Sequence, residues 1–282
     1  MNYKSNVCPY NDLFIYHLEG RFRDEDEKDL GKEYLGNWVE DNYSFLFFSA
    51  DPGYGIQIIL DQQSHLKLLD IYSFSYEGWQ GGGFEENRVE EFIIVPPWQR
   101  SCTDIDEYKI ILDPGVVFGN GLHPTTKDCI RAISFLKKHY SFKKVIDIGT
   151  GTGILAISAA HLGATDVSAV DLNPLAVKTA IKNVSLNCYE KNIKVYEGSA
   201  EYFSNNKADL LIANIHFEVI KSFFSCNGFF NKKYYIFSGL MRSQAGDLRE
   251  LISRYSLSVI NEWEYEMTWY TILARGDLYE ER

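Results

Sequence analysis

The sequence has few cysteines, and they form no pattern that predicts a disulfide framework or a zinc site. The five are widely spaced and include no C-x-x-C pair: Cys8, Cys102, Cys129, Cys188 and Cys226. The six histidines also lack the spacing of metal ligands. Scattered single thiols fit reduced cysteines in an intracellular protein better than bridges in a secreted one. We therefore expect no metal site and a cytoplasmic location.

Long apolar runs and an export signal are missing too. No apolar run approaches the ~18 residues expected of a membrane-spanning helix. The first residues do not pass from a charged segment into an apolar one, as a secretory signal does. These absences predict a soluble chain that does not act at a membrane.

Basic residues are in the minority. The chain carries 28 Lys and Arg against 39 Asp and Glu, a formal net charge of −11. This balance argues against direct nucleic-acid binding, which depends largely on neutralising phosphates. It suits a basic partner such as a Lys-rich protein, although many proteins are acidic simply for solubility. With 282 residues, 45% of them apolar, the chain can form one large domain or two ordinary ones.

The most informative local feature is the glycine-rich stretch D-I-G-T-G-T-G at residues 147–153. An apolar run at 145–148 leads into it, and a helical pattern of small residues follows at 155–162. This order predicts a strand, a tight turn and a helix N-terminus. Glycines let the backbone turn sharply and a ligand come close, and the first amides of the helix are unpaired donors. A plain glycine turn in an α/β protein is the alternative.

The glycine spacing narrows the choice of ligand. The dinucleotide fingerprint G-x-G-x-x-G would need a glycine where the chain has Ile154, which disfavours a dehydrogenase, and no Lys followed by Ser or Thr completes a P-loop. An acid followed by G-x-G-x-G resembles the first motif of class I methyltransferases that use S-adenosyl-L-methionine. Asp171 closes the next predicted strand, residues 167–170, where an acid would bind the ribose hydroxyls.

Residues 1–94 differ in composition from the rest, being aromatic-rich and acidic, and predict a small α+β domain. The G-Y-G turn at 53–55 separates two apolar segments and predicts a hairpin. The charged stretch 24–32 predicts the start of a helix that continues through Trp38 and Val39. Residues 95–112, with P-P-W at 96–98, form the predicted linker.

Residues 113–282 predict a second domain of the α/β class. Its first stretch, D-P-G-V-V-F-G-N-G-L-H-P-T-T at 113–126, has too many glycines and prolines for regular structure, and a helical pattern follows it. Predicted strands then alternate with helices, and two strands separated by a short turn end the pattern. The strands are residues 145–148, 167–170, 193–196, 210–213, 234–237, 257–263 and 269–274. A Rossmann-like parallel sheet closed by a C-terminal antiparallel hairpin is the fold of class I methyltransferases.

Several separated blocks together resemble the ribosomal protein L11 methyltransferase family (PrmA). They occur in the order IIVPPW, DPGVVFGNGLHPTT, DIGTGTGILAISAAHLGA, AVDLNPLAV, IANI and FSGLMRSQAGDL. The resemblance covers residues 92–275. It implies S-adenosylmethionine as cofactor and methyl transfer to lysine side chains or the α-amine of a ribosomal protein. It also implies that the N-terminal domain, residues 1–94, recognises that basic protein substrate, ribosomal protein L11 or a similar one. We expect the enzyme to be a monomer.

The resemblance also assigns the site residues. Thr126, Gly149, Asp171 and Asn214 match positions that contact S-adenosylmethionine or border the transfer site. Gly151 and Gly153 complete the cofactor loop. We expect the carboxylate of Asp147 beneath the methionine ammonium, with a turn-stabilising role as the alternative.

The transfer itself requires a neutral amine held in line with an activated methyl group. The sulfonium needs no metal and no covalent nucleophile, but a lysine amine has an unperturbed pKa of about 10.4 and must lose its proton. Asn214 and Phe118 are the predicted catalytic residues: the Asn214 oxygen would orient the amine, and the Phe118 ring would wall the site. For Phe118, core packing is the alternative.

The chain differs from the family pattern at two places, so the resemblance does not determine which amine accepts the methyl group. Asn120 stands where the family usually has Thr, and H-F-E at 216–218 replaces Leu-Ala and small residues. The alternatives are a methyltransferase for another protein lysine or a small-molecule amine, and a non-catalytic S-adenosylmethionine-binding module.

Overall fold

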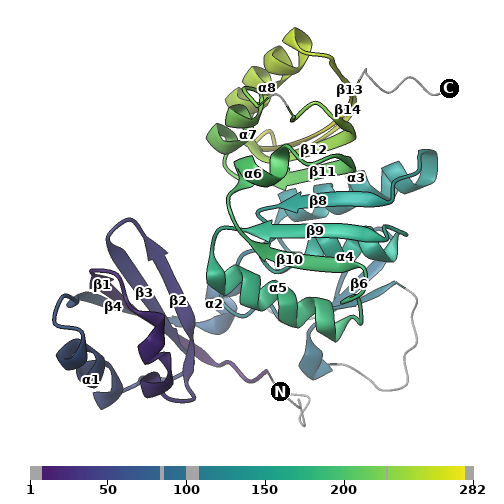
Figure 1. The fold of residues 1–282 in the computed structure, drawn as a ribbon. Helices are drawn as coiled ribbons and strands as arrows, with labels where there is room; N and C mark the ends of the chain where they lie inside the picture. Colours follow the sequence, from purple (N-terminus) through teal and green to yellow (C-terminus); the bar gives the residue numbers. More distant parts are fainter. Residues whose placement is uncertain (1–7, 83–85, 100–107, 227, 277–282) are drawn as a thin grey trace.

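The computed structural model describes residues 8–82, 86–99, 108–226 and 228–276 of the chain. The first part is a four-stranded antiparallel sheet in the order β2-β3-β1-β4, next to the helix α1 (Figure 1). Its elements are β1 (Asp12–Glu19), a 3₁₀ helix η1 (Asp24–Leu30), β2 (Tyr34–Glu40), β3 (Tyr43–Phe48), α1 (Tyr54–Gln62), β4 (Lys67–Ser75) and α2 (Tyr76–Gln80). This confirms a small N-terminal domain with a β-sheet.

Two local predictions in this domain were wrong. The segment after the G-Y-G turn is the helix α1, not the second strand of a hairpin; Ile56 and Ile59, three residues apart, point into the core. A short apolar run fits both the two-residue period of a strand and the 3.6-residue period of a helix, and this segment forms a helix. The helix expected from Asp24 ends at Leu30, and Trp38 lies in β2, paired with Phe45 of β3. Glycine at position 36, with φ +141°, favours this extended segment over a helix.

A three-stranded sheet connects the two parts of the chain. It comprises β5 (Asn87–Val89), β6 (Phe92–Val95) and β7 (Lys109–Ile111), in that order. The predicted linker, 95–112, therefore starts within β6, includes the 3₁₀ helix η2 (Pro97–Gln99) and ends just after β7.

The second part is a seven-stranded sheet in the order β10-β9-β8-β11-β12-β14-β13. The first five strands are parallel, and β14 pairs antiparallel with both β12 and β13, which confirms the predicted C-terminal hairpin. The strands are β8 (Lys144–Ile148), β9 (Asp166–Asp171), β10 (Ile193–Glu197), β11 (Ala208–Asn214), β12 (Lys232–Met241), β13 (Leu257–Tyr265) and β14 (Trp269–Gly276).

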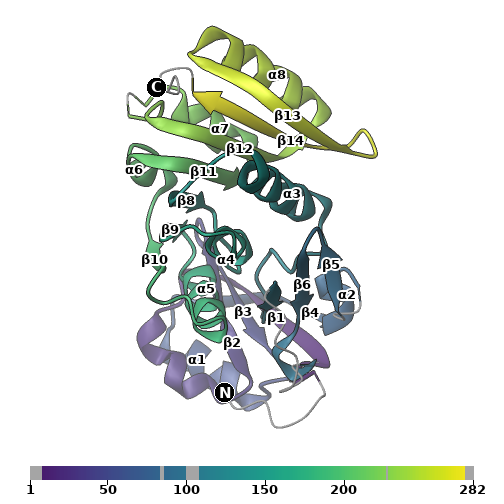
Figure 2. The ribbon, with the colours of Figure 1, turned by 90° about the vertical axis from the view of Figure 1, so that its right-hand side faces the viewer.

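Helices cover both faces of this sheet (Figures 1 and 2). Val145 and Ile146 show the division, because Val145 belongs to the core beneath one set of helices and Ile146 to the core beneath the other. One face carries α3 (Pro124–His139), α4 (Ile154–His161) and α5 (Pro174–Leu186). The other carries α6 (Ala200–Ser204), α7 (Phe217–Phe223) and α8 (Arg242–Arg254).

The N-terminal sheet packs on the second domain through a small apolar cluster. Leu13 and Phe47 of the sheet meet Val116 and Leu175 there. Gly36 makes this approach possible, since a Cβ at that position would overlap the Leu175 side chain. The first residues of α5 and the loop before α3 are thereby held against the N-terminal domain.

The remaining sequence predictions concern thiols, metals and membranes. Four of the cysteines are free thiols, and Cys102 lies outside the described residues. The described part of the chain contains no cluster of His, Cys, Asp and Glu suited to a metal ion. It also contains no helix long and apolar enough to span a bilayer.

Candidate functional site

The glycine-rich stretch forms a tight loop between β8 and α4. Gly149, Gly151 and Gly153 have φ values of +69°, +55° and +84°, a region that side chains rarely adopt. A Cβ on Gly149 would overlap Ile215, and one on Gly151 would lie 2.6 Å from the Phe118 carbonyl oxygen. The loop lies at the carboxyl end of β8, and the chain places β9 and β10 on one side of this strand and β11 and β12 on the other. Such a switch point is where open α/β sheets bind ligands.

Asp171 sits at the carboxyl end of β9 and is bonded to the glycine loop. Its Oδ2 accepts a hydrogen bond from the Gly151 amide at 2.9 Å, and its Oδ1 accepts one from the Asn173 amide at 3.0 Å. Burial raises the pKa of the Asp171 carboxyl, against the lowering effect of these amides. A carboxylate has about four acceptor positions, so two remain for the hydroxyls of a ribose.

Asp147 lies beneath the loop rather than on its open side. Its side chain is fully buried, and its Oδ2 accepts a 2.6 Å hydrogen bond from the Thr150 hydroxyl. Burial raises the pKa of Asp147 to about 7, although the Thr150 hydroxyl and the Ala156 amide lower it. These contacts are those of a turn-stabilising carboxylate. Contact with a methionine ammonium stays a prediction.

The stretch at residues 113–126 lies directly on the glycine loop. The Thr152 amide donates to the Phe118 carbonyl at 3.2 Å, and the Thr152 hydroxyl donates to the Gly119 carbonyl at 2.6 Å. The buried Asn183 of α5 joins the same two segments, because its Nδ2 donates to the carbonyls of Asp113 and Thr152, each at 2.9 Å. The two sequence motifs therefore form one structural unit.

The helix α3 begins at this unit. His123 is its N-cap residue, and its Nδ1 lies 2.7 Å from the Thr125 hydroxyl, so the imidazole anchors the loop. Thr126 follows in the first turn. Its hydroxyl is buried, and no group among the described residues bonds it. A buried hydroxyl without a partner is costly, so this atom suits a ligand that supplies one.

Asn214 ends β11 at the same edge of the sheet. Gly239 of β12, with φ +79°, faces it, and a Cβ at Gly239 would lie 3.2 Å from the Asn214 Oδ1. Within the described residues no hydrogen bond involves the side-chain amide of Asn214, so its Oδ1 is available as an acceptor. His216 and Glu218, from the departing segment, are exposed at the start of α7, and Glu218 pairs with Lys221 at 3.8 Å.

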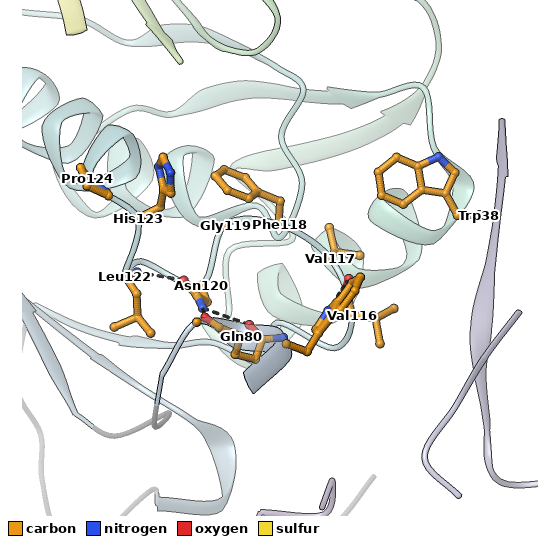
Figure 3. A pocket seen from close by; sticks show the side chains of 12 residues that line it. Trp38, Gln80, Val116, Val117, Phe118, Gly119, Asn120, Leu122, His123 and Pro124 are labelled. Atoms are coloured by element: carbon orange, nitrogen blue, oxygen red, sulfur yellow. Dashed lines mark hydrogen bonds between the residues drawn. The ribbon is translucent and has the colours of Figure 1, made fainter. Parts of the chain in front are cut away.

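Phe118 lines a pocket of about 570 Å³ at the boundary with the N-terminal domain (Figure 3). Its ring is 57% exposed, so it does not belong to the core. The ring contacts His123 edge-on at 5.3 Å, and His123 in turn contacts Trp269 at 5.1 Å. Gly149, Asp171 and Asn214 do not line this pocket; they lie at the carboxyl ends of the strands, beyond the Phe118 backbone.

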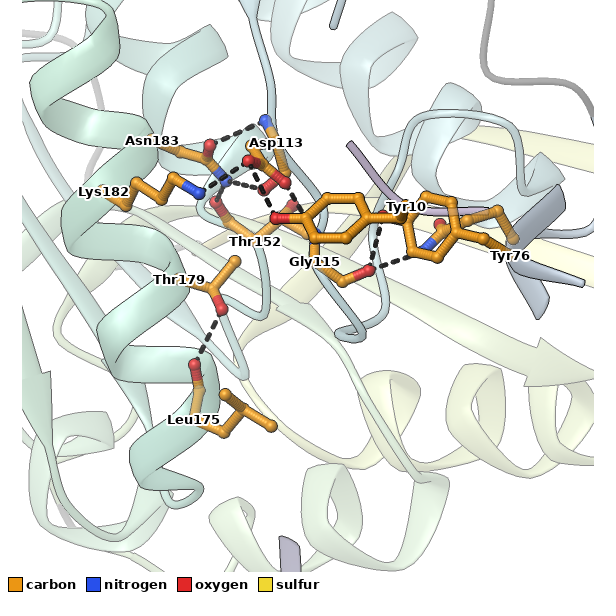
Figure 4. Close-up of polar contacts among 10 residues, drawn as sticks. Tyr10, Tyr76, Asp113, Gly115, Thr152, Leu175, Thr179, Lys182 and Asn183 are labelled. Carbon is orange, nitrogen blue, oxygen red and sulfur yellow. Dashed lines mark hydrogen bonds and ion pairs between the residues drawn. The ribbon is translucent and has the colours of Figure 1, made fainter. Parts of the chain in front are cut away.

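Sequence reasoning missed a polar network around Asp113 and Gly115, at the start of the loop before α3 (Figure 4). The buried Asp113 carboxylate pairs with Lys182 of α5 at 2.6 Å and accepts a long hydrogen bond from the Tyr10 hydroxyl at 3.5 Å. The Tyr76 hydroxyl donates to the Gly115 carbonyl at 2.6 Å. The partners lie up to 103 residues apart, so spacing along the chain gave no sign of them.

Leu172 was also missed as a candidate cofactor contact. It follows Asp171 directly, and its side chain is 73% exposed. An exposed leucine beside the acid that is predicted to bind the ribose would present an apolar surface to the same ligand. The sequence AVDLNP contains the available signal: an apolar residue between the strand-ending acid and the Asn-Pro helix start.

Sheet order, closing hairpin and glycine loop together define a class I methyltransferase fold. The family model described as "Ribosomal protein L11 methyltransferase (PrmA)" matches residues 77–276. The chain belongs to this family.

Curated relatives and a solved structure agree with the match. Ribosomal protein L11 methyltransferases of Exiguobacterium sibiricum and Bacillus cereus are each 36% identical to the chain, over 65% and 66% of its length. The matched parts are 58% and 60% of those proteins, so the chain matches less than two thirds of their length. The crystal structure of ribosomal protein L11 methylase from Lactobacillus delbrueckii subsp. bulgaricus is 27% identical, with a TM-score of 0.57, covering 68% of this chain and 96% of that one.

Proposed function

We propose that the protein is an S-adenosylmethionine-dependent protein N-methyltransferase, which methylates lysine side chains or the α-amine of ribosomal protein L11 or a similar basic protein. One observation carries the proposal: the family match over residues 77–276 includes every candidate site residue from Phe118 to Asn214. The same match supports action in the cytoplasm, where ribosomal proteins are made. We further propose that the enzyme acts as a monomer and does not bind nucleic acid directly.

The residues at the carboxyl ends of β8 and β9 suit this cofactor. In the proposal, the loop Gly149, Gly151 and Gly153 lets the methionine part approach the backbone, and Asp171 accepts from the ribose hydroxyls. Thr126 supplies a buried hydroxyl that lacks a partner among the described residues. When bound, S-adenosylmethionine supplies an activated methyl group.

The acceptor side of the reaction is assigned to Asn214 and Phe118. The Asn214 oxygen accepts a hydrogen bond from the incoming amine and fixes its lone pair in line with the methyl group. As a neutral side chain it stabilises the ammonium form less than a carboxylate would, and a carboxylate there would raise the amine pKa. The Phe118 ring keeps water from the reacting nitrogen. Orientation and desolvation are thus the contributions of this chain.

The N-terminal domain, residues 1–94, is the proposed substrate-recognition domain. Residues 1–76 lie outside the family match. The sheet nevertheless packs on the loop before α3 through Leu13, Phe47 and Val116. A substrate bound to this domain would therefore be delivered beside Phe118.

The unmatched N-terminal part also supports a second candidate, a methyltransferase of the same kind for another protein lysine or a small-molecule amine. Most of the proposed recognition domain lies outside the matched residues, and the exposed His216 and Glu218 belong to the segment that differs from the usual family sequence. Radiolabelled methyl transfer to ribosomal protein L11, with a total cell extract as second acceptor, separates the candidates. Label in a different protein reassigns the substrate. Calorimetric binding of S-adenosylmethionine without transfer to any acceptor points to the non-catalytic module.

A further inference from the structure

The pocket beside Phe118 has three walls from different parts of the chain (Figure 3). Trp38 comes from β2 of the N-terminal sheet, Trp79 and Gln80 come from α2, and the third wall is the loop that contains Phe118 and His123. Its volume of about 570 Å³ lies within the range of specific ligand sites. The site residues assigned above account for only one of these walls.

Hydrogen bonds join two of these walls, the one from α2 and the loop. The Trp79 indole donates to the Val116 carbonyl at 3.3 Å. The Asn120 amide donates to the carbonyl of Gln80 at 2.7 Å, while its oxygen accepts from the Leu122 amide at 2.9 Å. Asn120, the departure from the family's usual Thr, thus joins α2 to the loop. A larger amide side chain is used here to span the gap between two walls.

The chemistry of the lining is apolar and aromatic. The rings of Trp38 and Trp79 are 44% and 37% exposed. No described lining residue is Asp, Glu, Lys or Arg. Burial lowers the pKa of His123 and so favours its neutral imidazole. The indole faces can pack against the aliphatic stem of an alkylamine, and a site without a carboxylate gives the ammonium form no counter-ion, which lowers the amine pKa.

The pocket also adjoins the proposed methyl donor. Its Phe118 and Gly119 carbonyls are the ones that accept hydrogen bonds from Thr152 of the glycine loop. An amine that passes along the aromatic walls therefore reaches the backbone that borders the cofactor loop. Nucleic acid fits less well, because the chain carries a net charge of −11.

We propose that this pocket receives the methyl-acceptor side chain, an amine on an aliphatic stem, and that Trp38 and Trp79 promote its neutral form by burying it without a counter-ion. The proposal rests on the proposed function, which it deepens. It assigns acceptor specificity to Trp38, a residue outside the family match, and so links the N-terminal domain to the reaction. The source of the amine is a protein lysine, and a free alkylamine is the alternative source.

The first test is binding, which does not depend on turnover. The full chain is labelled with 5-fluorotryptophan, and Trp38→Phe assigns the Trp38 signal. N-acetyl-lysine N-methylamide should shift that signal, and its norleucine counterpart, n-butylamine and a single-stranded RNA should shift it less. A larger shift with n-butylamine makes a free amine the ligand, a larger shift with RNA makes the pocket a base site, and no shift with any probe overturns the proposal.

The second test is the pH dependence of transfer to ribosomal protein L11. Trp38→Ala should raise the acceptor KM about tenfold, because the surface that packs on the aliphatic stem is lost, and should leave the S-adenosylmethionine Kd unchanged. Trp38→Glu, compared with Trp38→Gln, should move the pH profile of kcat/KM upward, because a carboxylate stabilises the ammonium. Tyr43 of β3 is equally exposed at 43% but lies outside the pocket, so Tyr43→Ala and Tyr43→Glu are matched controls.

The outcomes keep the two proposals apart. If all Trp38 variants transfer methyl groups with the same acceptor KM and the same pH profile, the proposal that the pocket receives the acceptor is wrong. The proposed function is then unaffected. A Trp38 signal that responds to the lysine probe, in a protein that methylates nothing, supports the pocket and refutes the proposed function. If Trp38→Glu and Tyr43→Glu shift the pH profile of kcat/KM equally, the shift is a general effect of added charge. That result also contradicts the proposed role of the pocket.

Discussion

The Thr152 hydroxyl donates a 2.6 Å hydrogen bond to the Gly119 carbonyl, and this contact joins the two most distinctive motifs of the chain. Thr152→Val removes the donor and leaves a buried carbonyl without it. We predict a loss of about 1–3 kcal/mol in the free energy of unfolding, together with weaker S-adenosylmethionine binding. Urea unfolding and calorimetry measure the two effects. Thr152→Ser retains the hydroxyl and should recover most of both; equal losses in the two variants would point to packing instead.

Asp171 should determine cofactor affinity. Both of its carboxylate oxygens accept backbone amides, at 2.9 and 3.0 Å, whereas the amide side chain introduced by Asp171→Asn has a single acceptor oxygen. We predict that Asp171→Asn weakens S-adenosylmethionine binding by about 10–100-fold, the equivalent of roughly 1.4–3 kcal/mol. Asp166→Asn, at the start of the same strand and exposed, is the control and should bind normally. Normal binding by Asp171→Asn would remove this residue from the cofactor site.

The pH dependence of stability should report the burial of Asp147. Its pKa rises from 3.8 to about 7 in the folded protein, so the folded state holds this proton more tightly than the unfolded chain does. The associated stabilisation is complete below about pH 4 and is lost as the pH rises through about 7. Asp147→Asn can still accept from Thr150 but does not titrate. Its Tm should therefore fall less than that of the wild type between about pH 5 and pH 8, measured by calorimetry; parallel Tm curves would contradict this prediction.

Lys182 should stabilise the packing of α5 on the loop before α3. It pairs with the fully buried Asp113 at 2.6 Å, although about a third of its own side chain is exposed. Lys182→Met leaves a buried carboxylate without its cation, and we predict a cost of about 1–3 kcal/mol in unfolding free energy. Lys178 lies one turn away and pairs with Glu27 at the surface, so Lys178→Met should cost less than about 1 kcal/mol. Denaturant titration measures the unfolding free energy of both variants. Equal losses would show that the buried pair with Asp113 stabilises the protein no more than the surface pair does.

Much of the candidate cofactor site could be predicted from the sequence, because its elements are determined by residues that are close together in the chain. The glycine loop, the strand ending at Asp171 and the antiparallel end of the sheet each follow from periodicity and turn chemistry within a few residues. The positions of the described strands after residue 140 agree with the predicted ones to within a few residues.

Contacts between distant segments could not be predicted in this way. Asn120 bonds Gln80 only after α2 has packed on the loop before α3, and Asp113 bonds Lys182 only after α5 has packed on the same loop. The role of Asn120 as a bridge between pocket walls has no signal in its neighbours. The helix α1 was missed for another reason: five mostly apolar residues after a G-Y-G turn fit a strand and a helix equally well.

The most direct test of the account is intact-mass spectrometry of ribosomal protein L11 after incubation with the full chain and S-adenosylmethionine. We predict that the L11 mass increases by one or more methyl groups, located on lysine or the α-amine. Asn214→Ala should bind the cofactor yet lower the rate of transfer by at least about tenfold, since orientation of the amine is lost. An unchanged L11 mass, with S-adenosylmethionine bound and a new methyl group on another protein of the extract, would contradict the proposed substrate.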